Sequence, residues 1–213
     1  VGYSLLHWGL PFHKALFIVG PQASGKSTFL DIVRELIGPD GVASLTPQQM
    51  TERFGSARLV GKWANIRSDI PSQMIENTGE FKEIVAGDPI KAEKKGKDLF
   101  EFKPTAKHFY SANTLPDTED EDDAFWRRIL LVAFPSSVPV SERDRHLPRK
   151  LRDELPGILN WALDGLQRLE DQAGFTADRA PGATADTWAK WGSTVDRFAS
   201  LCIDTDPAAG PKA

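Results

Sequence analysis

The sequence has little cysteine, no long apolar run and no excess of positive charge. Cys202 is the only cysteine among 213 residues, so an intrachain disulfide is excluded and we expect a reducing, intracellular compartment rather than secretion. No apolar stretch approaches the ~20 residues that a membrane helix needs. The formal net charge of −4 excludes a broadly basic surface, so any contact with nucleic acid must be local. The four histidines lie too far apart to predict a zinc module.

The length bounds the number of domains. A chain of 213 residues can form one α/β domain with its own core and a small helical appendage, but not two large domains. Hydrophobic residues make up 40% and charged residues 26%, which is typical of a globular protein. Because the chain begins at Val1 without a methionine and its glycine-rich loop already starts at Gly20, we expect it to be a piece of a longer protein.

The most informative stretch runs from Gly20 to Thr28. It reads Gly20-Pro21-Gln22-Ala23-Ser24-Gly25-Lys26-Ser27-Thr28, between the apolar run Ala15–Val19 and a helix-like segment. This is the strand-loop-helix context of a phosphate-binding loop, in which backbone N–H groups and a helix N-terminus face the phosphates. We expect Lys26 to neutralise the terminal phosphate oxygens of ATP and Ser27 to bind Mg²⁺. The alternative is an ordinary glycine turn.

Apolar and turn-forming residues predict a mostly parallel sheet of five strands. The expected strands are Ala15–Val19, Val42–Leu45, Leu59–Ile66, Lys107–Ser111 and Ile129–Phe134. The expected helices are Thr28–Ile37, Gln49–Phe54, Ser72–Ala86 with Pro71 in its first turn and Gly87 as its stop, and Leu155–Leu169. Ile90–Lys103 has apolar ends and a lysine-rich centre, which predicts an inserted β-hairpin with a basic tip.

These elements divide the chain into four expected parts. Residues 1–13 form a lead-in, 14–136 the nucleotide-binding core, 137–172 a helical lid, and 173–213 a linker, a short helix and a tail. The linker is expected over Ala173–Ala185, because it is rich in Gly, Pro, Ala and Thr. The short helix is expected to carry Trp188, Trp191, Val195 and Phe198, and the tail from Asp204 to be disordered.

ATP hydrolysis requires a carboxylate at the end of a neighbouring strand, to hold Mg²⁺ and orient the attacking water. Asp69 is the candidate, since it follows the strand that ends at Ile66. The alternative is that Asp69 only caps the turn before Pro71. Asn113 ends another predicted strand, where its amide could orient the water or contact the γ-phosphate, although asparagine is also common in turns.

Arg127 and Arg128 precede the last predicted strand. The planar guanidinium suits the phosphate oxygens of the transition state, so either could act as an arginine finger. Alternatively, both pair with the acidic run Glu119–Asp123.

Four lysines gather on the predicted hairpin. Lys94, Lys95 and Lys97 lie at the tip and Lys91 on the ascending arm, where they could bind the phosphodiester backbone of single-stranded DNA. The alternative is that these lysines protect a sheet edge from aggregation. Phe100 and Phe102 are expected to face the core, and His108, inside an apolar strand, to be a buried structural histidine.

Taken in order, these segments resemble the helicase domain of phage, plasmid and poxvirus-type primase-helicases, which belong to superfamily 3 within the AAA+ class. The resemblance covers Gly2 to Phe198. It is carried by Gly20–Thr28, by Gly61–Ile66 with Asp69, by Ala86–Ile90 before the hairpin, by Phe109–Pro116, by Ala124–Ile129 and by Pro156–Ala162.

The resemblance implies a homo-oligomeric ring, most often a hexamer, that hydrolyses ATP between subunits and moves single-stranded DNA through its pore. It implies a sensor role for Asn113, a finger role for Arg128, and a pore position for Lys94, Lys95 and Lys97. It also implies a primase domain on the same longer chain, and a host-cell location for a phage, plasmid or viral element.

The sequence departs from the pattern of this family at two positions. Ser68 stands before Asp69 where the family has a second acid, and Ser24 replaces the asparagine that is frequent in the family's nucleotide loop. A small nucleoside or nucleotide kinase and a non-hydrolysing, ATP-gated assembly module remain alternatives.

Overall fold

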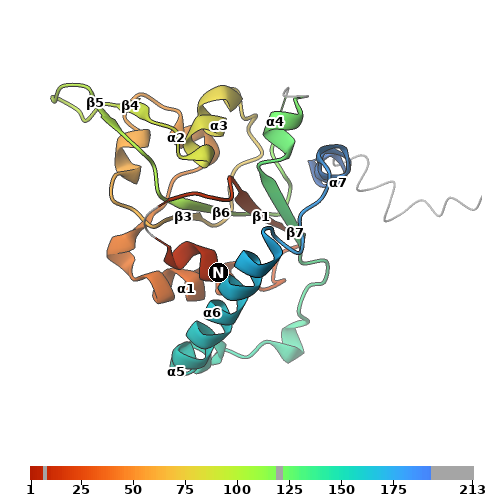
Figure 1. Cartoon of the computed structure of the whole chain (residues 1–213). Coiled ribbons are helices and arrows are strands. Elements are labelled where there is room, and N and C mark those ends of the chain that lie inside the picture. The colour runs from red at the N-terminus through yellow and green to blue at the C-terminus, as the bar shows by residue number, and fades with distance from the viewer. Residues whose placement is uncertain (7–8, 119–121, 193–213) are drawn as a thin grey trace, which may run out of the picture.

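The computed structural model describes residues 1–6, 9–118 and 122–192, with a five-stranded sheet at its centre (Figure 1). The strand order is β2-β3-β6-β1-β7, and every pairing in this sheet is parallel. The strands are β1 (Ala15–Val19), β2 (Val42–Ala43), β3 (Ala64–Arg67), β6 (Lys107–Ala112) and β7 (Ile129–Ala133). Each of the five predicted segments contains or overlaps one of these strands, although β2 and β3 differ from the predicted bounds, and the class is α/β.

Helices cover both faces of the sheet (Figure 1). One face carries η1 (Gly2–Leu5), α1 (Lys26–Ile37), α5 (Leu147–Asp153) and α6 (Leu155–Gln172). The other face carries α2 (Pro47–Met50), α3 (Thr78–Ala86), α4 (Asp123–Trp126) and α7 (Pro181–Gly192). The remaining short helices are η2 (Pro39–Gly41), η3 (Ser56–Leu59) and η4 (Val140–Glu142). None of the described helices is both long and apolar enough to cross a membrane.

Successive side chains of a strand point to opposite faces of the sheet, so they pack into two cores, one on each face. Phe17 of β1 and Tyr110 of β6 face α2, α3, α4 and α7, and their ring centroids lie 4.8 Å apart. Ile18 and Phe109 face α1, where they pack with Leu30. Because parallel strands covered on both faces bury nearly all their side chains, β1 and β7 are continuous apolar runs in the sequence, whereas β3 and β6 also bury polar residues such as Asn65 and His108.

The segment after α6 differs from the expected linker. Helix α7 begins at Pro181, and Trp188 is only 3% exposed, packs on Phe17 with ring centroids 4.8 Å apart, and donates from Nε1 to the Pro116 carbonyl at 2.8 Å. Trp188 therefore stabilises helix α7, whose first residues were predicted to belong to a linker because of their Gly, Pro, Ala and Thr content. Val195, Phe198 and the tail from Asp204 lie outside the described residues.

Three predicted boundaries were wrong for reasons of capping and turn geometry. Helix α3 begins at Thr78 rather than in the turn after Pro71, because the Asn77 side chain caps it by accepting from the Glu80 N–H at 3.2 Å. Helix α2 begins at Pro47, where Thr46 and Gln49 form a capping box. Residues 59–66 are not one strand, because η3 occupies the first part and β3 starts only at Ala64.

Helix α6 does not bury the whole predicted face. Ala162 and Leu169 are buried, but Leu159 and Leu163 are 38% and 46% exposed. A Cβ on Gly2 would lie 2.0 Å from the Ala162 carbonyl oxygen, so only glycine allows η1 to approach α6 this closely.

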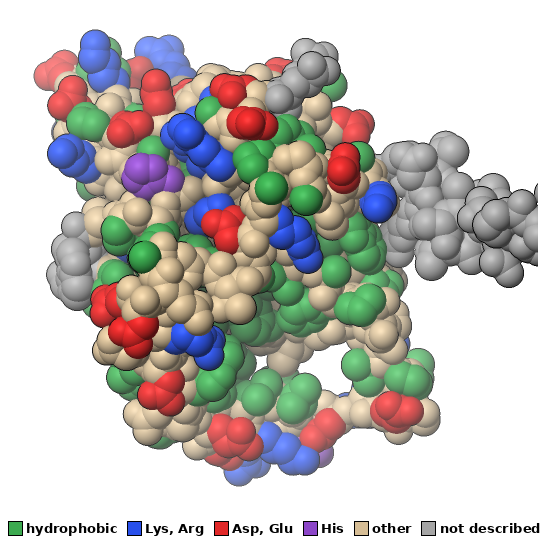
Figure 2. Space-filling model, turned by 45° about the vertical axis from the view of Figure 1, so that its right-hand side comes forward, with side chains coloured by type: hydrophobic (Ala, Val, Ile, Leu, Met, Phe, Trp, Pro, Cys, Tyr) green, Lys and Arg blue, Asp and Glu red, His purple; other side chains and the backbone are tan. Residues whose placement is uncertain are grey.

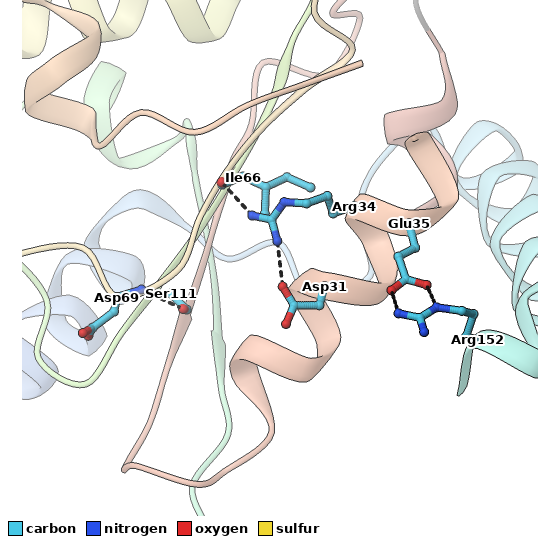
Figure 3. Close-up of polar contacts among 7 residues, drawn as sticks. All are labelled: Asp31, Arg34, Glu35, Ile66, Asp69, Ser111 and Arg152. Carbon is cyan, nitrogen blue, oxygen red and sulfur yellow. Dashed lines mark hydrogen bonds and ion pairs between the residues drawn. The ribbon is translucent and has the colours of Figure 1, made fainter. Parts of the chain in front are cut away.

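An ion pair joins α5 to α1. Arg152 of α5 donates to both carboxylate oxygens of Glu35 on α1, at 2.5 and 2.8 Å (Figure 3). These bonds lower the pKa of Glu35 below its usual value.

Candidate functional site

The loop between β1 and α1 has two residues in the left-handed region. Gly25 has φ of 92°, and Ala23 also lies in the left-handed region, with φ of 57°. A Cβ on Gly20 would lie 2.1 Å from the Phe134 carbonyl oxygen, so this position must be glycine for β1 and the end of β7 to lie side by side. The loop therefore turns tightly into the first residue of α1.

Lys26 lies folded over this loop. Its Nζ donates to the carbonyls of Gly20 at 2.8 Å and Pro21 at 2.7 Å, to Ser24 Oγ at 3.3 Å, and to Asn113 Oδ1 at 3.0 Å. The side chain is buried, and these four oxygens are all uncharged. An anionic oxygen that reached Lys26 would form a stronger, charge-assisted bond than these carbonyls do.

The sheet itself brings Asn113 to the loop. Ala112, the last residue of β6, pairs with Val19, the last residue of β1, so the residues that follow the two strands meet at the carboxyl edge. Ser27 is exposed and Thr28 half-buried in the first turn of α1, where unpaired N–H groups and the helix dipole favour an anion. The predicted loop residues Gly20 to Thr28 and Asn113 thus form one site.

Residues 137–138, which follow β7 and which we call the strap, are hydrogen-bonded to the outside of the loop. Ser137 Oγ donates to the Gln22 carbonyl at 2.7 Å, and the Val138 N–H donates to the Ala23 carbonyl at 2.9 Å. These bonds fix the loop at its one non-glycine residue of positive φ. The strap was not predicted, because backbone hydrogen bonds leave no side-chain signature in the sequence.

Asp69 lies at the same edge of the sheet, beyond β3. Its N–H donates to Ser111 Oγ at 3.2 Å, and the Ile70 N–H donates to the Ser111 carbonyl at 2.9 Å. The residue is exposed, with φ of 55°, and its carboxylate points away from Ser111 (Figure 3). Within the described residues this carboxylate accepts no hydrogen bond, so it does not cap the turn before Pro71.

Arg127 and Arg128 lie at the opposite edge of the sheet. The Ala15 N–H, at the start of β1, donates to the Arg128 carbonyl at 2.8 Å. The five residues of β1 separate this point from the nucleotide loop by roughly 15 Å, at about 3.3 Å per residue. Neither arginine therefore reaches the loop of its own chain.

The two arginines differ in their surroundings. Arg128 is half-buried and donates to the carbonyls of Lys82 at 3.1 Å and Ala124 at 2.5 Å. Burial, and then the neighbouring Arg127, lower the pKa of Arg128 from its usual value. Arg127 is exposed. Within the described part of the acidic run, Asp122 forms an ion pair with Lys82 at 3.6 Å, while its charge acts on Arg128 without a direct bond.

The predicted hairpin is confirmed. Strands β4 (Ile90–Ala92) and β5 (Phe100–Phe102) pair antiparallel and project from the body near α2 and α3, away from α5 and α6 (Figure 1). Lys94, Lys95 and Lys97 are exposed at the tip, and Lys91 is exposed on the arm opposite Glu101.

The two hairpin phenylalanines have different neighbours. Phe102 packs against the main core, as predicted. Phe100 instead lies under Lys94, whose Nζ is 5.8 Å from the ring centroid. On the face seen in Figure 2, Lys and Arg are interspersed with Asp and Glu, so the tip is a local basic feature, as the net charge required.

His108 is buried, as predicted, but it is not fully hydrogen-bonded. Its Nδ1 lies 3.4 Å from Asn65 Nδ2 and 3.5 Å from the Tyr110 hydroxyl, whereas Nε2 has no partner among the described residues. Burial, and then the charge of Lys107, lower the pKa of His108 to about 3. The imidazole is therefore neutral at pH 7 and contributes structure to the core.

Sequence comparison finds several large viral proteins. The chain is 32% identical over 154 residues to "Putative helicase L207/L206" of Acanthamoeba polyphaga mimivirus, covering 68% of the chain and 16% of that protein. It is 28% identical over 149 residues to "Putative helicase 184R" of Invertebrate iridescent virus 6, covering 64% and 15%. It is 29% identical over 180 residues to "Putative helicase 022R" of Frog virus 3, covering 73% and 18%. The chain thus spans less than a fifth of these relatives.

Structural comparison finds the same fold in the apo structure of the NrS-1 C terminal region. The TM-score is 0.62 at 13% sequence identity, over 97% of this chain and 48% of that one. At this identity the likeness establishes the α/β fold alone.

A family model matches residues 18–128, from the second-last residue of β1 to Arg128, and so includes the loop Gly20 to Thr28, Asp69, the hairpin and Asn113. The match covers more than half of the chain, which therefore belongs to the family of unknown function DUF5906.

Proposed function

We propose that this chain is the ATP-dependent motor of a DNA helicase or translocase, of the superfamily 3 type within the AAA+ class, in a viral or mobile-element replication protein. The observation that carries the proposal is the convergence of Lys26 and Asn113 on a glycine-rich loop at the carboxyl edge of a parallel sheet. The relatives named as helicases favour this function over a small nucleoside or nucleotide kinase.

The residues of the loop are suited to a nucleoside triphosphate with Mg²⁺. Lys26 would exchange its carbonyl partners for the β- and γ-phosphate oxygens, and the N–H groups of residues 23–28 would surround them. Ser27 and Asp69 offer the hydroxyl and carboxylate oxygens that Mg²⁺ prefers, and bound Mg²⁺ would neutralise charge on the phosphates. Asn113, next to Lys26, would orient the attacking water.

The finger arginine would come from a neighbouring copy. Because Arg127 and Arg128 lie at the edge opposite the nucleotide loop, a head-to-tail ring would place them at the loop of the next subunit. Exposed Arg127 is free to extend, whereas Arg128 would have to leave its two carbonyls. A hexamer is the ring we propose.

The hairpin lysines would hold single-stranded DNA in the pore. Lys94, Lys95 and Lys97 cluster at a projecting tip, and Lys91 extends the same basic strip. Such contacts to phosphates are independent of base sequence, which suits a motor that moves along DNA. A primase domain elsewhere on a longer chain remains part of the proposal.

The decisive experiment measures ATP hydrolysis with and without single-stranded DNA, for the wild type and for Lys26→Ala. We expect DNA to stimulate hydrolysis, and Lys26→Ala to abolish nucleotide binding. Transfer of phosphate to a nucleoside or nucleotide would instead identify a kinase. Assembly with ATP but without turnover would identify an assembly module.

A further inference from the structure

A cavity of about 430 Å³, which we call the α6 cavity, lies between the sheet and helix α6. Helix α6 lies beside η1 on this face of the sheet (Figure 1). The walls come from η1, from the first residues of β1 and β6, from β7, from one side of α6 and from residues 174–177. The volume is in the range of roughly 300–1,000 Å³ that is typical of small-molecule sites. None of the loop residues Gly20 to Thr28 lines the cavity, so it is separate from the proposed ATP site.

The walls of the α6 cavity are mainly apolar. The largest apolar side chains come from the sheet and from the elements opposite it, namely Leu16, Phe109, Leu130, Tyr3, Trp161 and Phe175. The rings of Tyr3 and Phe175 pack edge to face, with centroids 5.6 Å apart. Trp161 is still 59% exposed. A ligand with an apolar body would therefore remove further apolar surface from water, which favours binding.

Lys107, the first residue of β6, brings a buried ammonium group to this wall. The residue is only 2% exposed, and its Nζ lies 5.4 Å from the centroid of the Tyr3 ring and donates to the neutral carbonyl of Leu6. Among residues 1–6, 9–118 and 122–192, no carboxylate pairs with it. Burial lowers the pKa of Lys107 to about 8. Because a buried charge without a counter-ion is costly, an anion beside Lys107 would be stabilised.

The other charged side chains of the wall do not supply that counter-ion. Lys14 pairs with Asp178 at 2.5 Å and is thereby neutralised. Arg168 is exposed, and its guanidinium lies back over Gly165, where a Cβ would be 3.9 Å from Arg168 Nη2. Its side chain makes no hydrogen bond or ion pair within the described part of the chain. No Asp or Glu is among the described residues that line the cavity, so its wall is positively charged.

We infer that the α6 cavity binds a small monocarboxylate with an apolar body. The carboxylate would accept a charge-assisted hydrogen bond from Lys107, which is stronger than the bond that Lys107 now makes to the Leu6 carbonyl. The apolar body would lie among the aromatic and aliphatic walls, and Arg168 would add to the attraction for the negative charge. This inference goes beyond the proposed function and does not depend on it.

The test measures binding of octanoate to the chain by isothermal titration calorimetry. The matched ligand is 1-octanol, which has the same number of carbons and no charge. We expect octanoate to bind with one-to-one stoichiometry and at least about tenfold more tightly than 1-octanol, because only octanoate offers Lys107 a charged acceptor. Lys26→Ala, which removes the ammonium of the proposed ATP site, should bind octanoate as the wild type does.

Two substitutions test the two halves of the cavity. Lys107→Met removes the ammonium and keeps an unbranched stem, so it should weaken octanoate binding by at least about tenfold and leave 1-octanol binding unchanged. Gly165→Leu places a side chain in the cavity, and it should weaken the binding of both ligands. The control is Gly157→Leu, on the same helix but outside this cavity, where a Cβ would meet no atom within 4 Å. It should bind both ligands as the wild type does.

The outcomes decide the inference whether or not every variant folds. Absence of octanoate binding by the wild type would overturn it, and so would equal affinities for octanoate and 1-octanol. Octanoate binding that Gly165→Leu leaves unchanged would place the ligand outside the α6 cavity and would overturn it as well. If Lys107→Met does not fold, the comparison of the two ligands and of the two glycine variants still gives the result. Loss of ATP binding or hydrolysis has no bearing on these measurements, so the two proposals fail separately.

Discussion

The Lys26 ammonium lies 3.0 Å from the Asn113 side-chain oxygen, although 87 positions separate the two residues in the sequence. The parallel pairing of β1 with β6 produces this contact, since both strands end at the same edge. Asn113 therefore contacts Lys26 directly, and a ligand that drew Lys26 towards a phosphate would release the amide to bind water or an oxygen of the ligand.

Replacing Asn113 separates nucleotide binding from turnover. We expect Asn113→Ala to keep ATP affinity within a few-fold and to lower the rate of hydrolysis by about 10²–10³, the usual effect of removing one positioned polar group at a reacting oxygen. Asn113→Asp should instead weaken ATP binding, because its carboxylate would hold Lys26 and repel phosphate. Fluorescent-nucleotide titration and a phosphate-release assay measure the two effects, with Asn160→Ala, an exposed asparagine on α6, as the control. Equal losses from Asn113→Ala and Asn160→Ala would remove Asn113 from the site.

We expect alanine substitutions of Arg127 and Arg128, at the sheet edge opposite the loop, to change the stability of the fold by different amounts. Arg128→Ala leaves the carbonyls of Lys82 and Ala124 without their donor, so it should lower the free energy of unfolding by about 1–3 kcal/mol. Arg127→Ala, at an exposed position, should change it by less than about 0.5 kcal/mol. Urea denaturation monitored by tryptophan fluorescence measures both.

The same variants test whether the site is shared. If either arginine acts on a neighbour's ATP, substoichiometric amounts of that alanine variant should lower the ATPase rate of mixed assemblies more than in proportion to the added subunits. A loss that follows the mixing ratio would show that the arginine acts only within its own subunit. Because Arg127 is exposed, we expect Arg127→Ala to keep the fold intact, so that its result is free of any effect on stability.

Local signals were sufficient to predict the sheet and the glycine-rich turn between β1 and α1. The loop has particular residues at fixed spacing, and the runs at β1 and β7 are uniformly apolar, so both are visible in the sequence. The start of α3 was missed because it depends on the Asn77 cap and not on apolar spacing. Helix α7 was missed over Pro181–Ala185 because its stability comes from Trp188 packing on Phe17, a contact between distant parts of the chain. Long-range hydrogen bonds such as Val138 to Ala23 likewise have no local signal.

The hairpin predicts a particular salt dependence of DNA binding. Lys94→Ala/Lys95→Ala/Lys97→Ala should weaken binding to single-stranded DNA and reduce the slope of log K against log salt by about 0.7 for each DNA phosphate that the variant no longer neutralises. Fluorescence anisotropy over a range of salt concentrations measures the slope. The control is Lys190→Ala, an exposed lysine on α7, which should leave the slope unchanged. An unchanged slope for the triple variant would exclude the tip from the DNA path.

His108 predicts a loss of stability in acid. Burial lowers its pKa in the folded chain to about 3, from 6.5 for an exposed histidine, so between these values the unfolded chain binds more protons than the folded chain. The free energy of unfolding should therefore fall as the pH drops from about 6.5 towards about 3. His108→Phe cannot bind the proton and should show a shallower pH dependence over this window.

A second substitution separates titration from packing. His108→Gln also lacks the titrating group but keeps a polar side chain near Asn65 and Tyr110, so its absolute stability can differ from that of His108→Phe while its pH slope should match. Urea denaturation at a series of pH values gives both quantities, and the carboxylates contribute equally to all three proteins. The contact between the Asn65 amide N–H and His108 Nδ1 requires Nδ1 to act as an acceptor, which favours a neutral imidazole in the folded core. If both variants instead keep the wild-type pH slope, His108 must be protonated in the folded core, and the prediction is wrong.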